Sequence, residues 1–404
     1  MHEPLRVLHL SPEFPPVIGG IGDHVDWLTE ELAGLGLEVR VLTSPRSTHR
    51  EAAGVEVSAT VENWDRRLWQ AVAREVETFR ADVLHLHYQQ LMYQGDPAIG
   101  FLPWALAVRG QRPAIVTTIH DMQRPSRTPR VIGRLALEAL LYGSDRLLVN
   151  GEAEYRGLAK RPMLKARSTL LPNGSNIQVR PISADQGRSL RASVCSDENA
   201  FLLGSFGLVR PGKGLEVLLD SIAELRARSV RVELLVIGAV GDADPVGGAA
   251  YRDGLLDQRR RLGLEESVQF LGHLPEGRVS ELLQVCDLGV LPFLTGAFTG
   301  HTSVFAALSH GLPLLTTRGP NTETVFTQGA VSLIPAPPEP GALANAIHAL
   351  MLDPEQLRSL ASKGREVADR FTQQALGAQV AAIYSGAARA PASRQEARTP
   401  ASRP

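Results

Sequence analysis

The sequence contains only two cysteines, Cys195 and Cys286, among 404 residues. Two thiols without C-x-x-C spacing do not make a disulfide framework, so we interpret both as small buried side chains in a reducing cytosol. An excess of charge is also lacking, because the formal net charge is −1, and no global field favours nucleic acid or an anionic membrane. No apolar stretch reaches the roughly 18 residues of a membrane span. We therefore expect a cytoplasmic protein with no nucleic-acid partner and at most peripheral contact with the inner face of a membrane.

Lysine is scarce as well, and one of the four lysines lies in the most informative stretch of the chain. The apolar run 201–206 predicts a buried strand, the glycines and proline of 207–214 predict a loop, and apolar residues then recur at helical spacing. Arg210 and Lys213 thus lie on a loop just before a helix N-terminus, where backbone N–H groups are unpaired. This combination predicts a site for phosphate or diphosphate, and the alternative is a solvated basic loop.

The N-terminal half opens with alternating elements: a strand at 6–10, a glycine- and proline-rich loop at 11–23, a helix from His24 capped by Asp23, and a strand at 37–43. That order is the opening of a nucleotide-binding fold. It is not the dinucleotide fingerprint, because Val25 occupies the place of the third glycine after Gly20 and Gly22, and no carboxylate ends the second strand. NAD is therefore not expected, and the glycines instead let backbone N–H groups approach a ligand.

Strands and helices continue to alternate through the rest of this half. We expect strands at 55–60, 81–87, 114–119 and 146–150, and helices at 64–79, 102–108 and 131–142. Such alternation implies a parallel sheet covered on both faces, with ligands bound beyond the carboxyl ends of the strands.

Three histidines, His85, His87 and His120, lie at or near these strand ends. Each is either a hydrogen-bonded structural side chain or a group that binds a ligand. We favour the structural interpretation for His85, leave His87 open, and favour a function for His120. A zinc site built from His85 and His87 is not expected, because the sequence offers no evident third ligand.

A second alternating set begins at residue 201, after a turn at 170–174 and a polar connector at 183–199. Its expected strands are 201–206, 232–237, 268–271, 288–291 and 312–316, followed by helices at 354–370 and 372–385. Two similar α/β halves favour a ligand cleft between domains. Asp242 and Asp244 spell a D-x-D motif on a glycine-rich loop, and we do not expect it to bind a metal.

Six segments resemble glycosyltransferases of the GT-B fold, group 1, also called family 4. They are residues 19–22, like the family's glycine loop; 118–121, like its T-x-H-D strand end; 171–174, like its P-N-G hinge; 207–214, like its R-P-x-K-G loop; 268–274, like the V-x-F-L-G-x-L strand beside the nucleotide base; and 286–292, like the D-x-x-x-x-P strand before the sugar loop. Each segment alone is a weak signal, but their common order and spacing over residues 6 to 386 make the resemblance specific.

The resemblance implies an α/β protein of GT-B architecture, with two Rossmann-like domains that face each other across a cleft and C-terminal helices that cross back to the first domain. The implied boundaries are 1–180 for the acceptor-side domain, 181–370 for the nucleotide-sugar-binding domain, and 371–387 for the helix that packs back. Residues 388–404 are rich in Ala, Arg, Pro and Ser, and we expect them to be a disordered tail.

The resemblance also implies transfer of a sugar from a UDP-, GDP- or ADP-sugar to an acceptor such as a glycan, a lipid carrier or a small molecule, with retention and without metal or cofactor. It assigns catalysis to His120, Arg210 and Lys213. The remaining implied site residues are Gly20, Gly22, Gly300, His301, Thr302 and Ser303 around the diphosphate and sugar, Gly272, His273 and Leu274 at the base edge, and His87 and Asp121 on the acceptor side. Physical chemistry agrees, because cations aimed at a leaving diphosphate stabilise the transition state more than the ground state.

The sequence departs from the family at three positions. Phe298 and Ala306 stand where the family has two glutamates, of which the first normally faces the donor sugar and the second the ribose. Leu208 stands where an arginine usually precedes the lysine, and Arg210 is its nearest substitute. A helix that starts near Ser303, capped by Thr302 or Ser303, still offers first-turn N–H groups to an anion. Two rival hypotheses are a catalytically inactive GT-B protein that binds nucleotide or sugar, and a nucleotide-sugar epimerase of the same fold.

Overall fold

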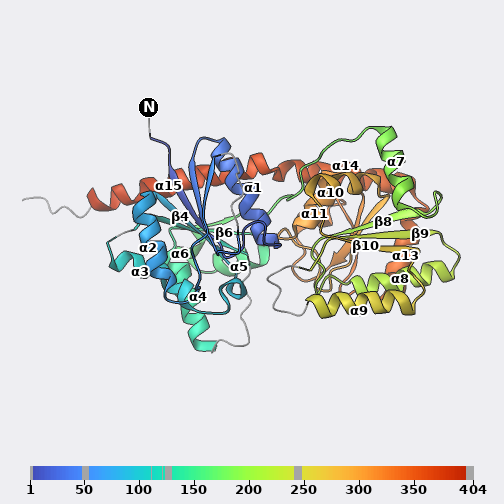
Figure 1. Cartoon of the computed structure of the whole chain (residues 1–404), viewed down its shortest axis with the longest axis horizontal. Helices are drawn as coiled ribbons and strands as arrows, with labels where there is room; N and C mark the ends of the chain where they lie inside the picture. Colours follow the sequence, from blue (N-terminus) through green and yellow to red (C-terminus); the bar gives the residue numbers. More distant parts are fainter. Residues whose placement is uncertain are drawn as a thin grey trace, which may run out of the picture. The chain divides into compact units, whose positions relative to one another are not determined.

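The computed structural model describes residues 3–47, 54–110, 112–120, 122, 130–240 and 248–396. The chain forms two compact units (Figure 1). The first contains Met1–Pro172 together with Gln373–Pro404, and the second contains Asn173–Thr372. The division that we predicted after residue 180 therefore lies inside the second unit. The last helix belongs to the first unit, although it is remote from it in sequence.

The first unit is built on a parallel sheet of seven strands in the order β3-β2-β1-β4-β5-β6-β7. The strands are β1 (Arg6–Leu10), β2 (Glu38–Leu42), β3 (Val55–Ser58), β4 (Val83–Tyr88), β5 (Ala114–Ile119), β6 (Arg146–Val149) and β7 (Ser168–Leu170). All six residues of β4 and of β5 are buried, as expected for central strands of a sheet that is covered on both faces. The short edge strand β7 was not predicted.

Helices cover both faces of this sheet (Figure 1). They are α1 (Gly20–Gly34), α2 (Leu68–Phe79), η1 (Gln90–Tyr93), α3 (Ala98–Val108), α4 (Arg130–Gly143), α5 (Glu152–Ala159), α6 (Pro162–Lys165) and α15 (Gln373–Glu396). The chain runs outward in one direction from β1 and in the other from β4, so right-handed crossovers place α1 on one face and α2, α3 and α4 on the other. Helix α15 contacts α1, β4 and β5. In the described parts of the chain no helix is both long and apolar enough to cross a bilayer.

Two predictions about these helices were wrong. Helix α1 begins at Gly20 rather than His24, and its cap is Gly19 in an extended conformation, so Asp23 lies in the first turn and is not the cap. Helix α15 continues to Glu396, where we expected disorder from residue 388. Glycine at the start of α1 disfavours a helix locally, but the tertiary contacts of α1 with α15 and β2 outweigh that preference.

The second unit repeats the strand order with a parallel sheet of six strands, β10-β9-β8-β11-β12-β13. The strands are β8 (Phe201–Phe206), β9 (Val232–Ile237), β10 (Val268–Gly272), β11 (Leu288–Leu291), β12 (Leu314–Arg318) and β13 (Ser332–Pro335). The predicted bounds of β8, β9 and β11 are confirmed. Strand β12 starts two residues after its predicted start at 312, and β13 was not predicted.

The helices of the second unit include one where the sequence predicted a connector. They are α7 (Ala184–Val194), α8 (Leu215–Ala227), α9 (Gly248–Arg261), α10 (Glu276–Val285), α11 (Thr302–Ser309), α12 (Thr324–Thr327), α13 (Pro340–Met351), α14 (Pro354–Ala368) and η2 (Asp369–Phe371). Helix α7 replaces the predicted connector at 183–199. Its signal was present, because Ser183 and Gln186 form a capping box, the S/T-x-x-E/Q pattern of helix starts.

Each sheet has a point where the strand order reverses, between β1 and β4 in the first and between β8 and β11 in the second. Ligands of open α/β sheets bind beyond the carboxyl ends of the strands at such points. The fold therefore has two candidate ligand-binding positions. The carboxyl ends of β1 and β4 carry histidines, and the carboxyl ends of β8 and β11 carry the basic loop.

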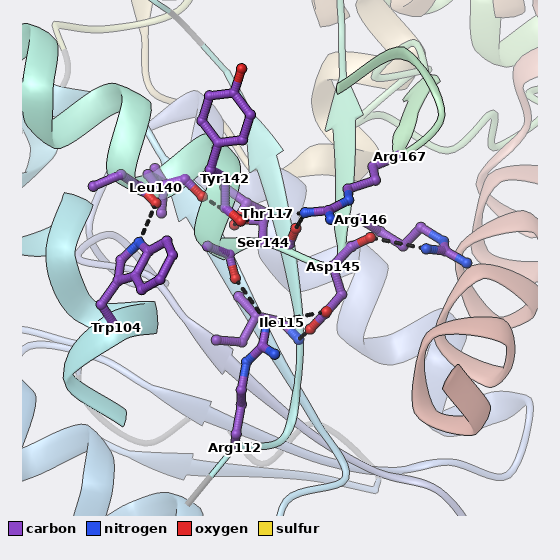
Figure 2. Close-up of polar contacts among 12 residues, drawn as sticks. Trp104, Arg112, Ile115, Thr117, Leu140, Tyr142, Ser144, Asp145, Arg146 and Arg167 are labelled. Atoms are coloured by element: carbon purple, nitrogen blue, oxygen red, sulfur yellow. Dashed lines mark hydrogen bonds and ion pairs between the residues drawn. The ribbon is translucent and has the colours of Figure 1, made fainter. Parts of the chain in front are cut away.

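Asp145 fixes the turn that leads from α4 into β6. Its carboxylate accepts the backbone N–H of Ile115 at 2.9 Å and lies 3.2 Å from the guanidinium of Arg112. Beside it, the hydroxyl groups of Ser144 and Thr117 lie 2.8 Å apart (Figure 2). These contacts join the end of α4 to the start of β5, the strand that leads to His120.

We expect Asp145→Ala to destabilise this unit by about 1–3 kcal/mol, because a buried N–H loses its acceptor. The local measurement is hydrogen exchange of the β5 amides, which should accelerate at Ile115. Asp253→Ala is the matched control, since the ion pair of Asp253 with Arg252 is largely exposed and its loss should change stability by less than about 0.5 kcal/mol. Unchanged exchange at Ile115 in Asp145→Ala would contradict this role.

Candidate functional site

A glycine allows the loop between β8 and α8 to lie directly against the end of β11. Gly214 caps α8 with a positive φ of 71°, and a Cβ there would lie 2.0 Å from the carbonyl oxygen of Pro292. No other residue fits this position without moving the backbone. Lys213, next to it, is half-buried, and its ammonium lies 4.7 Å from the centre of the Phe293 ring. Arg210 is exposed on the same loop.

The loop before α11 brings a second set of polar atoms to the same place. Within the described parts of the chain, the buried Nδ1 of His301 and Oγ of Ser303 have no hydrogen-bond partner. Ser303 also faces the loop after β8, because a Cβ on Gly207 would lie 3.5 Å from its own Cβ. Buried polar atoms without partners are costly, so their presence at a strand-order reversal indicates a ligand that supplies the missing bonds.

Helix α11 starts at Thr302, and the cap position is His301, whose side chain makes no capping bond. The predicted capping of this helix by Thr302 or Ser303 was therefore wrong. The side chain of Ser303 is left for another partner, and the first-turn N–H groups lie at the positive end of the helix. Gly300 precedes them, and a Cβ there would collide with the Phe298 ring at 2.3 Å.

An aromatic stack continues from Lys213. The His301 ring lies 3.9 Å from that of Phe293 and 4.2 Å from that of Phe298, measured between centroids. Burial, followed by the charges of Lys213 and Arg210, holds the pKa of His301 well below its usual 6.5. Burial and then Arg210 lower the pKa of Lys213 to about 7. The stack therefore combines a neutral imidazole with an amine that titrates near neutral pH.

The positions of the missing family residues are apolar in the structure. Leu208 lines a pocket together with Lys213 and Phe293. Phe298 is half-buried, and Ala306 is completely buried in the core. No carboxylate is therefore supplied from positions 298 and 306.

Sequence reasoning missed a carboxylate that holds this loop. Glu323, which is 1% exposed, accepts the backbone N–H and the hydroxyl of Thr299, each at 2.9 Å. Thr299 is the neighbour of Phe298, so an acidic group does reach the loop, from the cap of α12. The sequence shows an acidic residue after β12, but no motif links it to Thr299.

Three glycines form a row from the basic loop towards the edge of the sheet. Gly207, Gly238 and Gly272 have φ of 133°, 142° and 68°. A Cβ on Gly238 would lie 2.0 Å from the Gly207 carbonyl oxygen, and its N–H donates to the Gly272 carbonyl at 3.1 Å. The row ends at the predicted base-edge residues, where His273 is exposed and Leu274 is half-buried. A bare backbone surface of this kind suits a flat ligand.

The first unit places five histidines around the ends of β1, β4 and β5. They are His9, His24, His85, His87 and His120. His85 is satisfied at both ring nitrogens, by the hydroxyls of Tyr384 at 2.6 Å and Thr118 at 2.7 Å, which agrees with its structural interpretation. The argument that no third ligand accompanies His85 and His87 was wrong, because His9 on β1 adjoins both.

A chain of hydrogen bonds links three of the other rings, those of His9, His87 and His120. His9 Nδ1 lies 3.1 Å from His87 Nε2, and His87 Nδ1 lies 3.2 Å from His120 Nε2. The Nδ1 of His120 lies 3.1 Å from the side-chain amide of Asn150. Burial lowers the pKa of His9 to about 3 and holds those of His87 and His120 well below 6.5. Each ring is thus neutral and has one donor and one acceptor.

The remaining predicted residues lie near this group or outside the described residues. Gly20 and Gly22 are in the first turn of α1, and only Gly22 is buried. Glu13 adjoins them, since a Cβ on Gly19 would meet its carboxylate at 2.2 Å. Asp121, and the D-x-D motif of Asp242 and Asp244, lie outside the described residues.

Comparisons with known families cover both units. The family described as Glycosyl transferases group 1 matches residues 188–367, and Glycosyltransferase Family 4 matches residues 18–179. D-inositol 3-phosphate glycosyltransferase 2 of Catenulispora acidiphila is 26% identical over 94% of both chains. A glycogen synthase of Mycobacterium tuberculosis is 27% identical over 95% of both chains.

Solved structures with the same fold cover nearly the whole chain. HepE of Anabaena, in complex with UDP and glucose, matches with a TM-score of 0.76 at 20% identity and covers 95% of this chain and 100% of its own. WaaG, a glycosyltransferase involved in lipopolysaccharide biosynthesis, matches with a TM-score of 0.68 at 17% identity and covers 94% and 100%. The predicted α/β fold with two Rossmann-like sheets is confirmed.

Lys213 should make diphosphate binding depend on pH. A bound anion favours the ammonium form, so binding above pH 7 takes up a proton, and affinity for UDP should fall by at most about tenfold per pH unit between pH 7 and 9. Calorimetry in two buffers of different ionisation enthalpy measures both affinity and proton uptake. His301 stays neutral over this range and does not contribute.

Lys213→Ala should remove this slope and weaken binding by roughly tenfold to over a hundredfold, the loss of a charge-assisted contact. Arg210→Ala is the control, because its guanidinium does not titrate in this range and the slope should remain. The same slope in Lys213→Ala as in the wild type would assign the proton to another group.

Proposed function

Because the chain belongs to the group 1 glycosyltransferases of the GT-B fold, we propose that it transfers a sugar from a nucleotide diphosphate donor to a hydroxyl acceptor with retention. A UDP-sugar is the first donor to test, since HepE, a structural neighbour, was solved with UDP and with UDP-glucose. The observation that carries the proposal is the convergence of Lys213, Ser303 and His301 at the strand-order reversal of the second unit.

The proposed chemistry follows from where charge develops. Cleavage of the sugar–phosphate bond leaves negative charge on the diphosphate and positive character on the sugar. Lys213, Arg210 and the first-turn N–H groups of α11 meet the negative charge, and Ser303 Oγ donates to a phosphate oxygen. These donors are fixed by the fold before the reaction, which is the condition for strong electrostatic catalysis. In this proposal no metal is needed at the diphosphate.

His120 is proposed to meet the donor sugar. Its ring is neutral, and its Nδ1 is held by Asn150. Its Nε2 is paired with His87 Nδ1, so a sugar hydroxyl group takes the place of His87 at that atom. The neutral imidazole adds no positive charge beside a developing oxocarbenium ion. On the acceptor side, the relative named for D-inositol 3-phosphate makes a phosphorylated polyol the first acceptor to test.

The rival is a protein that binds a nucleotide sugar without turnover, and the absence of carboxylates at Phe298 and Ala306 motivates it. The two are separated by incubating the purified chain with UDP-, GDP- and ADP-sugars and following release of the nucleotide. We expect release from one donor class. His120→Ala should reduce turnover strongly while nucleotide affinity, measured by calorimetry, changes little, because the cationic site lies in the second unit. Tight binding of a donor without release in the wild type would support the rival.

Ribose recognition should be loose, because neither Phe298 nor Ala306 offers an acceptor to the vicinal diol. A site without such an acceptor discriminates weakly, so a 2′-deoxyribose donor should lose less than about tenfold in kcat/KM. If the start of α11 binds the phosphates, Ser303→Ala should lower the rate of sugar transfer more than Phe298→Leu does. Both are measured as steady-state rates on matched donors. Refusal of the deoxy donor by about a hundredfold or more would mean that another carboxylate holds the ribose.

A further inference from the structure

We propose that His24, His87 and His120 form a binding site for a divalent transition-metal ion, with Zn²⁺ as the ion that fits the ligands. The three rings come from α1, β4 and the residue after β5, and one ring nitrogen of each lies within 4.8 Å of the others. Three imidazoles with a free fourth position are an established zinc ligand set. The site lies in the first unit, apart from the cationic loop. It shares His120 with the donor-sugar contact proposed above, so an ion and that contact exclude one another at this ring.

Two of the ligand nitrogens already have the required spacing. His87 Nδ1 and His120 Nε2 are 3.2 Å apart. Zinc–nitrogen bonds of 2.0–2.1 Å in a tetrahedron place the ligand atoms about 3.3 Å from one another. The separation of these two nitrogens therefore already suits two ligands of one ion that replaces the hydrogen bond between the rings, and His24 has to approach.

His24 is the ring that the folded chain leaves without a full set of contacts. It is 3% exposed, and within the described residues its buried Nδ1 has no hydrogen-bond partner. Its ring centroid lies 5.2 Å from that of His120 and 5.9 Å from that of His87. A buried ring nitrogen without a partner is costly, and the ring has no hydrogen bond at this atom that a rotation towards an ion would break.

One outer contact of a metal site is present, and a half-turn of one amide would supply a second. Metal-ligating histidines donate their other ring N–H to an acceptor, which fixes the tautomer. His87 Nε2 lies 3.1 Å from His9 Nδ1, and His120 Nδ1 lies 3.1 Å from the side-chain amide of Asn150. The amide of Asn150 accepts from His120 once its oxygen and nitrogen exchange places, a half-turn of the side-chain amide.

The neighbouring triad of His9, His85 and His87 does not offer the same site. His85 uses both ring nitrogens, on Tyr384 and on Thr118, at 2.6 and 2.7 Å. An ion there would break one of these short hydrogen bonds of His85, whereas in the first triad the bond to be given up is the longer one between His87 and His120. His120 is also half-buried while the other rings are buried, so the first triad contains the most exposed of the five rings.

The test is titration of the metal-free chain with Co²⁺, whose visible absorption reports tetrahedral coordination. We expect one Co²⁺ per chain, displaced by Zn²⁺. His24→Gln should show no saturation in the range where the wild type saturates, and Asn150→Ala should bind about 10–100-fold more weakly. His348→Ala is the control, because His348 lies on α13 in the second unit, and it should bind as the wild type does.

His24→Cys identifies the ligand directly. Its thiolate should add a charge-transfer band to the Co²⁺ spectrum, which the wild type lacks, and this readout serves even if His24→Gln does not fold. Octahedral Co²⁺ only, or equal affinity in the wild type and a folded His24→Gln, would overturn the proposal. Nucleotide binding and transfer are measured separately on the metal-free chain, so failure of the metal site and failure of the proposed function can be told apart.

Discussion

Close contact between backbone segments at the carboxyl end of β8 is the constraint on which the second unit depends. The Gly207 carbonyl occupies the space of a side chain on Gly238, and the Pro292 carbonyl occupies that of a side chain on Gly214. These contacts hold the carboxyl ends of β8, β9 and β11 close together. As a result, the Lys213 ammonium lies over the Phe293 ring, and Ser303 lies beside Gly207. A residue with a Cβ at Gly214 or Gly238 would separate the strand ends and disperse the polar atoms of the site.

The two units use the same strand order for different chemistry. At the reversal point of the second sheet stand two cations and polar atoms without partners, an environment suited to an anion. At that of the first sheet stand neutral imidazoles in a continuous chain of hydrogen bonds, an environment that adds no net charge. The two sheet ends therefore suit different ligand chemistry, an anionic group in the second unit and an uncharged polar group in the first.

The sequence predicted several elements well because their signals are local. The apolar runs of β8, β9 and β11 and the glycine loop before α8 were each read from adjacent residues, and the structure brings Lys213, His301 and Ser303 together. The missed side-chain contacts depend on pairing between distant segments. His9 meets His85 because β1 and β4 pair in one register. Tyr384 reaches His85 across 299 positions, and Glu323 reaches Thr299 from another loop. Contacts between distant segments leave no pattern in the sequence of either segment alone.

The aromatic replacement at Phe298 changes the electrostatics of the cationic loop. A carboxylate beside His301 would face Lys213 through the stack of Phe293 and His301 and would stabilise the ammonium. A phenyl ring offers no such compensation, and burial then lowers the pKa of Lys213 to about 7. In the proposed function the amine gains its full charge when a diphosphate binds, because the ligand itself supplies the counter-charge. Glu323 keeps the loop in place through Thr299 without placing a carboxylate at position 298.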